Sequence, residues 1–63
     1  MRGNTMIRIL VVDDHPIVRE GLVAILEAQD DFDVIAEGNN GAEAVDLYRR
    51  LQPDVVLMDL QMP

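Results

Sequence analysis

Two short, almost entirely apolar runs that meet aspartate at their ends constrain this chain more than any other feature. The first run lies at 7–12 and is followed by Asp13 and Asp14. The second lies within 54–59 and ends in Asp59. Runs of this kind are typical of strands that are covered on both faces of a parallel sheet. A carboxylate at the end of such a strand costs free energy unless another group requires it there.

Two segments with the apolar spacing of helices lie between these runs. Pro16 suits the first turn of a helix, and the stretch 16–29 places four apolar side chains on one face, Val18, Leu22, Ile25 and Leu26. Gly21 costs this helix up to about 1 kcal/mol relative to alanine, which a close approach to a neighbouring strand would explain. A second helix is expected over 41–52, with a packing face of Ala44, Val45, Tyr48 and Leu51.

The remaining segments complete an alternating order of strands and helices. A strand is expected over 34–37, after a polar turn at 30–33. Asn40 and Glu43 have the spacing of a capping box at the start of the second helix. Strands that alternate with helices of this length predict an α/β fold, in which right-handed crossovers build a parallel sheet.

The three carboxylates suggest a metal site. Functional groups in open parallel sheets gather beyond the carboxyl ends of the strands, so Asp13, Asp14 and Asp59 meet there if the first and last strands are neighbours. A divalent cation relieves the repulsion between carboxylates, and Mg²⁺ prefers such oxygen ligands. A carboxylate beside Mg²⁺ can act as a nucleophile toward phosphorus and form an acyl-phosphate. A single aspartate after a strand is more often a turn or cap residue. The hypothesis therefore rests on the whole order, in which two apolar strands that end in aspartate enclose a helix, a strand and a second helix.

Composition narrows the function further. The chain of 63 residues has a net charge of −7 and contains arginine but no lysine, so this segment is a poor surface for nucleic acid. The absence of cysteine excludes disulfides and thiolate metal sites. Its apolar runs are too short for a signal peptide or a membrane span. We therefore expect a cytoplasmic protein without membrane contact.

Two stretches, "ILVVDDHPIVREGLVAIL" and "VIAEGNNGAEAVDLYRRLQPDVVLMDLQMP", resemble the first half of the receiver domain of bacterial two-component response regulators. The resemblance covers 7–63 and leaves 1–6 as an N-terminal leader. "VVDDHPIVREGL" is similar to the subgroup whose regulators carry a C-terminal LuxR-type helix-turn-helix DNA-binding domain. The resemblance implies a flavodoxin-like, doubly wound parallel sheet, limited here to strand, helix, strand, helix and strand.

The resemblance also implies a role for each matching residue. Asp59 matches the phosphoacceptor, which takes a phosphoryl group from a sensor histidine kinase. Asp14 matches the direct Mg²⁺ ligand, and Asp13 matches the second acidic residue, which usually reaches the metal through water. Gln61 matches the position whose backbone carbonyl completes the metal site. The module implied in this way is a signalling switch and not an enzyme.

A whole receiver domain is longer than this chain, so the resemblance implies a fragment. The later strands, which carry a hydroxyl residue and a lysine that contact the phosphoryl group, have no counterpart here, and DNA would be bound only through the missing C-terminal domain. The last strand, within 54–59, would then be an exposed apolar edge of the sheet. We expect the fragment to self-associate through that edge.

Two alternatives remain open from the residues alone. The first is an Mg²⁺-dependent aspartyl-phosphate phosphotransferase or phosphatase, although the usual second aspartate two residues after the nucleophile is absent after both Asp59 and Asp13. The second is a chemically inert, self-associating half-domain. His15 invites a metal-ligand interpretation, but a loop residue before Pro16 is the more frequent case because histidine sites usually bring further ligands.

Overall fold

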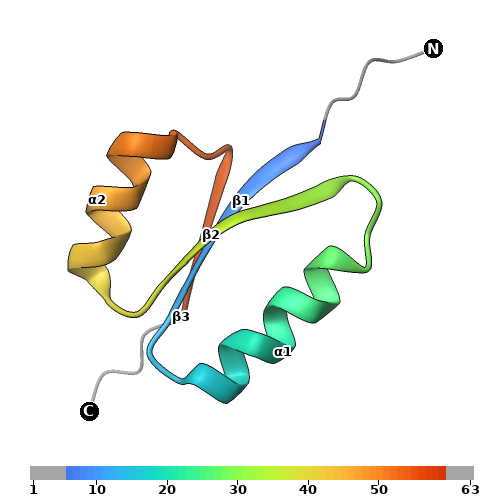
Figure 1. Ribbon diagram of the computed structural model, residues 1–63, viewed down its shortest axis with the longest axis horizontal. Coiled ribbons are helices and arrows are strands. Elements are labelled where there is room, and N and C mark those ends of the chain that lie inside the picture. The colour runs from blue at the N-terminus through green and yellow to red at the C-terminus, as the bar shows by residue number, and fades with distance from the viewer. Residues whose placement is uncertain (1–5, 60–63) are drawn as a thin grey trace.

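The computed structural model describes residues 6–59, which form one parallel three-stranded sheet with a helix on each side (Figure 1). The elements are β1 (Ile7–Asp13), α1 (Pro16–Glu27), β2 (Phe32–Gly38), α2 (Gly41–Leu51) and β3 (Val55–Asp59). The strand order is β2-β1-β3, and both pairings are parallel. This confirms the predicted α/β fold and its order of elements.

Strand β1 is the centre of the structure because it pairs with both other strands and lies between the two helices. Its four apolar residues 9–12 are at most 3% exposed. Successive side chains of a strand point to opposite faces, and Leu10 and Val12 pack with Ala44 of α2. Ile9 and Val11 are therefore on the α1 face. Burial of each such side chain stabilises the fold by about 1.5–3 kcal/mol.

The packing face predicted for α1 is only half correct. Leu22 and Leu26 are half-buried, as is Val23. Val18 and Ile25, however, are 48% and 65% exposed. In the described part of the chain, α1 packs only on β1 and β2, so a narrow stripe of the helix suffices to cover them.

The packing face predicted for α2 is also partly wrong. Ala44 is buried and Leu47 packs against the same core, whereas Val45 and Tyr48 are 53% and 50% exposed. The inward stripe therefore runs through Ala44, Leu47 and the half-buried Leu51. Val45 and Tyr48 line an open apolar groove of about 370 Å³ between α2 and β3, together with Gly41, Ala44, Arg49, Val56 and Met58.

The start of α2 has a modified capping box. The Asn40 side chain accepts a hydrogen bond from the Glu43 backbone N–H at 2.9 Å, as predicted. The return bond differs, because the Glu43 carboxylate accepts from the N–H of Asn39 at 2.7 Å and not from that of Asn40. The capping box therefore also holds Asn39, the residue before the N-cap, in the loop after β2.

An arginine that the sequence reasoning did not single out holds the other end of α2. The Arg8 guanidinium, from β1, donates to the carbonyls of Leu51 and Gln52 at 2.6 and 2.8 Å. These carbonyls are otherwise left without partners at a helix C-terminus, where a cation is favourable. The backbone N–H of Arg8 also donates to the Asp54 side chain at 2.9 Å. Arg8 thus joins β1 to the connection between α2 and β3.

Strand β2 is longer than predicted and contains a bulge. We expected Phe32 and Asp33 in a turn, but they pair with Ile7 and Arg8, the first two residues of β1. The register shifts after the pair Ile9–Val34, since the next residue of β1 pairs with Ala36. One residue of β2 is therefore left over, as in a β-bulge. Helix α1 also ends at Glu27 and not at 29.

No helix within residues 6–59 is long and apolar enough to cross a membrane. The space beside Gly21 is also informative, because a Cβ built there would meet nothing within 4 Å. The expected close approach of a strand is therefore absent among the described residues, and Gly21 retains only its cost to the helix.

Replacing Gly21 with alanine should raise the free energy of unfolding by about 0.5–1 kcal/mol, because alanine has the higher helix propensity and restricts the unfolded chain. Urea denaturation followed by far-ultraviolet circular dichroism measures this. Gly38→Ala is the matched control, since its Cβ would lie 3.4 Å from Leu47 in a buried position and should bring no comparable gain. A loss of stability in Gly21→Ala would contradict the open space beside α1.

Candidate metal site at the carboxyl end of the sheet

The sheet brings two of the predicted carboxylates to the same level. Asp13 ends β1, Asp59 ends β3, and the two residues are register partners in the parallel pairing. Asp14 follows directly in the loop before α1. Asp13 is fully buried, whereas Asp14 and Asp59 are exposed. The prediction that the first and last strands are neighbours is confirmed.

The Asp13 carboxylate is only partly satisfied by the protein. One oxygen, Oδ1, accepts a hydrogen bond from the backbone N–H of His15 at 2.8 Å. The other, Oδ2, is buried and has no hydrogen-bond partner within residues 6–59. A buried polar atom without a partner is costly, so this oxygen fits a site in which a cation supplies the missing interaction. The donor set of carboxylate oxygens fits Mg²⁺.

His15 lies against both neighbouring carboxylates. Its Nδ1 atom is 2.8 Å from Asp14 Oδ1 and 3.4 Å from Asp13 Oδ1. One ligand atom from each of these three residues lies within 4.8 Å of the others. The structure thus joins His15 to the cluster, although the sequence favoured a plain loop role. Gln61 is outside the described residues, and the ligand roles of Gln61 and Asp59 stay predictions.

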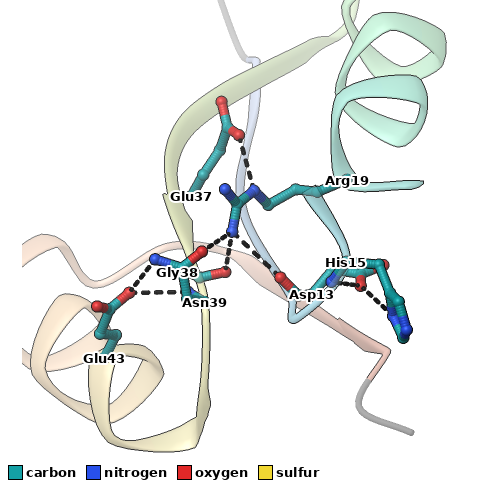
Figure 2. A network of polar contacts seen from close by, with 7 residues as sticks. All are labelled: Asp13, His15, Arg19, Glu37, Gly38, Asn39 and Glu43. Atoms are coloured by element: carbon teal, nitrogen blue, oxygen red, sulfur yellow. Dashed lines mark hydrogen bonds and ion pairs between the residues drawn. The ribbon is translucent and has the colours of Figure 1, made fainter. Parts of the chain in front are cut away.

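Arg19 of α1 holds the loops that carry the site (Figure 2). Its Nη1 donates to the carbonyl oxygens of Asp13 and Gly38, both at 3.1 Å, and to the side chain of Asn39. Its Nε lies 3.2 Å from the Glu37 carboxylate. One guanidinium therefore contacts the last residues of both β1 and β2.

The position of Arg19 has a clear physical reason but a weak sequence signal. Its side chain is only 17% exposed, and each charge-assisted hydrogen bond that it donates is stronger than a neutral one. Glu43 extends the network by accepting from Asn39 (Figure 2). In the sequence, an arginine on a helix that also carries charged neighbours is more often solvated, so the periodicity of α1 alone did not identify it.

Comparisons with known proteins agree with this geometry. The family model of the response regulator receiver domain matches residues 9–63. The transcriptional regulatory protein LiaR of Bacillus subtilis is 58% identical over 57 residues, which are 90% of this chain and 27% of LiaR. A protein-glutamate methylesterase/protein-glutamine glutaminase of Paramagnetospirillum magneticum is 51% identical over 63 residues, 100% of this chain and 18% of that protein.

Two solved structures have the same fold. The signal receiver domain of the response regulator NarL from Mycobacterium tuberculosis superposes with a TM-score of 0.85 at 41% identity, over 92% of this chain and 47% of that one. A LuxR-family response regulator from Aurantimonas also gives a TM-score of 0.85, at 48% identity, over 92% of this chain and 41% of its own. The chain spans about a quarter of the length of the transcriptional regulators that it matches. The family match, these relatives and the shared fold together show that the chain belongs to the response regulator receiver domain family.

Proposed function

We propose that this chain is the phosphoryl-accepting segment of a two-component signalling protein and that Asp59 is the acceptor. The observation that carries the proposal is the register of Asp59 with the buried Asp13 at the carboxyl end of the sheet. Asp59 is exposed at the end of β3, so a phosphodonor can reach its carboxylate. The membership of the receiver family supports the same role.

The acidic residues of this edge would hold the cation. Asp13 and Asp14 would contribute carboxylates, and Asp59 and the backbone carbonyl of Gln61 would complete the set. Mg²⁺, when bound, neutralises negative charge on the phosphoryl oxygens and on the carboxylates around it. Arg19 keeps the Asp13 carbonyl and the loop after β2 in position and is therefore a positioning residue.

The transfer step balances in a simple way. A carboxylate oxygen of Asp59 forms a bond to phosphorus, while the P–N bond of a phosphohistidine donor breaks. The donor imidazole leaves with that electron pair and takes up a proton, and Asp59 becomes an acyl-phosphate. We propose a sensor histidine kinase as the donor, which implies a cytoplasmic location for this segment.

The relatives favour transcription as the output. Several of them are named transcriptional regulatory proteins, so we propose that the parent protein controls transcription through a separate DNA-binding domain, and that residues 7–63 are part of a longer receiver domain. A methylesterase is also among the relatives. We therefore infer that the output depends on the domain to which the receiver domain is joined. The segment itself is proposed to be a switch and not an enzyme.

We also propose that this chain self-associates through β3. In the described residues, β3 pairs only with β1, and its side chains remain open, with Val55 39%, Leu57 37% and Met58 50% exposed. An apolar strand edge is a template for pairing with another chain. A second copy would cover both the edge and the apolar groove beside it.

Incubation with a small-molecule phosphodonor and Mg²⁺ should give a single phosphoryl adduct in intact-mass spectrometry. Asp59→Asn should abolish the adduct, because the amide is a poor nucleophile, and chelation of the metal should do the same. Asp33→Asn, at the opposite end of the sheet, is the matched control and should retain it. An adduct that survives in Asp59→Asn would refute the assignment of the acceptor.

Replacing Arg19 with glutamine should lower the free energy of unfolding by about 2 kcal/mol, because buried carbonyls lose a charged donor. Arg19→Lys should restore little of this, since one ammonium cannot reproduce the forked contacts of the guanidinium. Arg49→Gln, at an exposed position of α2, should change stability by less than about 0.5 kcal/mol. Equal effects of Arg19→Gln and Arg49→Gln in urea denaturation would argue against the positioning role.

Light scattering coupled to gel filtration should give a mass above that of one 7.1 kDa chain. Leu57→Lys introduces a charge at the edge and should shift the equilibrium toward the monomer. Glu27→Gln, at the end of α1, changes the net charge by the same single unit, is the control for that change and should leave the mass unaltered. A monomeric mass at all concentrations, with a cooperative unfolding transition, would contradict self-association through β3.

A further inference from the structure

We propose that His15 is a further protein ligand of the cation site, and that its imidazole nitrogen gives the site a preference for first-row transition-metal dications over Mg²⁺. The inference rests on the proposed function, because it concerns the same site, and adds a residue and a metal class to it. The residues involved are consecutive, since Asp13 ends β1, and Asp14 and His15 connect it to α1.

The first supporting observation is the unpartnered oxygen of Asp13. This side chain is 0% exposed, and its Oδ2 has no hydrogen-bond partner in the part of the chain that the structure describes. A buried carboxylate oxygen without a partner requires a cation or an equivalent donor. This observation is independent of the distances among the three residues, and it gives the cluster one buried carboxylate with an unused oxygen.

The second observation is the spacing of the ligand atoms. His15 Nδ1 lies 2.8 Å from Asp14 Oδ1 and 3.4 Å from Asp13 Oδ1. Adjacent ligands at right angles around an ion with bonds of about 2.1 Å are separated by about 3.0 Å, and tetrahedral ligands at a similar bond length by about 3.3 Å. These two separations bracket those values, so the His15 nitrogen needs little movement to share an ion with either carboxylate.

The third observation is that the His15 side chain is not used to cap the helix. It occupies the N-cap position of α1 with extended backbone angles, φ −111° and ψ 105°, and its side chain makes no capping hydrogen bond. Its backbone carbonyl instead accepts from the N–H of Arg19 at 2.8 Å. The residue before a proline is restricted to extended conformations, and in this conformation the His15 imidazole lies against the Asp14 carboxylate.

The chemistry of the donor set decides the preference. Mg²⁺ takes hard oxygen ligands and gains little from an imidazole. Fe, Ni, Cu and Zn ions accept imidazole readily, and their affinity for mixed nitrogen and oxygen sites rises along the first row. A cation bound here would separate Asp14 Oδ1 from His15 Nδ1 and bind both atoms. The site would therefore bind Ni²⁺ or Co²⁺ more tightly than Mg²⁺.

The test uses Ni²⁺ and Mg²⁺ in separate calorimetric titrations of the full chain and of two variants. His15→Gln should weaken Ni²⁺ binding by at least about tenfold, comparable to the loss of one metal-orienting contact, and should leave Mg²⁺ binding within about twofold. Asp14→Asn should weaken both. Circular dichroism shows whether each variant is folded as the unaltered chain is.

A second readout uses the fact that the chain has one histidine. Paramagnetic Co²⁺ or Ni²⁺ should broaden the proton resonances of the His15 ring at a low metal ratio. Asp14→Asn should remove this broadening if the ion is chelated. Broadening that persists unchanged in Asp14→Asn would mean that a lone imidazole binds the ion, and would overturn the proposal.

Two further results would also overturn it. Unchanged Ni²⁺ affinity in His15→Gln would exclude the imidazole as a ligand. Tighter Mg²⁺ binding in the same variant would mean that His15 competes with the cation. Phosphorylation of Asp59 in His15→Gln with Mg²⁺ separates the two proposals, because it should proceed even if His15 is no ligand. Failure of Asp59 to be labelled in any variant would count against the acceptor role and leave the result on nickel intact.

Discussion

The buried carboxylate of Asp13 at the end of the central strand is the constraint on which the rest of this structure depends. Placing it there requires β1 to be paired on both edges and covered on both faces. The burial of four consecutive apolar residues of β1 shows that both conditions are met. Parallel pairing then puts the end of β3 beside it. Among the described residues, the same burial leaves one oxygen of Asp13 without a hydrogen-bond partner, so the stable core and the proposed cation site arise from one strand.

Two arginines anchor β1 at its opposite ends, although the chain is strongly acidic overall, with a net charge of −7. Arg8 binds the carbonyls at the end of α2, and Arg19 binds the carbonyls at the ends of β1 and β2. In both cases the guanidinium satisfies backbone oxygens that regular secondary structure leaves unpaired. The two arginines therefore hold neighbouring elements of the fold together, while the carboxylates of Asp13, Asp14 and Asp59 lie at the carboxyl end of the sheet.

The sequence predicted the parts of this molecule that depend on local pattern. The five elements, the parallel sheet and the meeting of Asp13 with Asp59 at one edge all followed from apolar runs and their order. Features that depend on long-range contacts could not be predicted in this way. Arg8 and Arg19 have ordinary surroundings in the sequence, and their partners are distant carbonyls. Val45 and Tyr48 have helical spacing, but only the position of β3 determines that they line a groove. His15 lies at the candidate site because the bend at Asp14 places its ring against the carboxylates.

The bulge in β2 has a consequence for how charge is distributed between the two layers of the sheet. Before the bulge Val34 pairs with Ile9, and after it Glu37 pairs with Val11, so both lie on the layer of α1. With a regular strand from Val34 onward, Glu37 would instead be the neighbour of Val12, on the layer of α2, where its carboxylate would point into hydrocarbon. A single extra residue thus shifts the phase of the strand, directs one negative charge toward Arg19 and keeps it away from the apolar contacts of Leu10 and Val12 with Ala44.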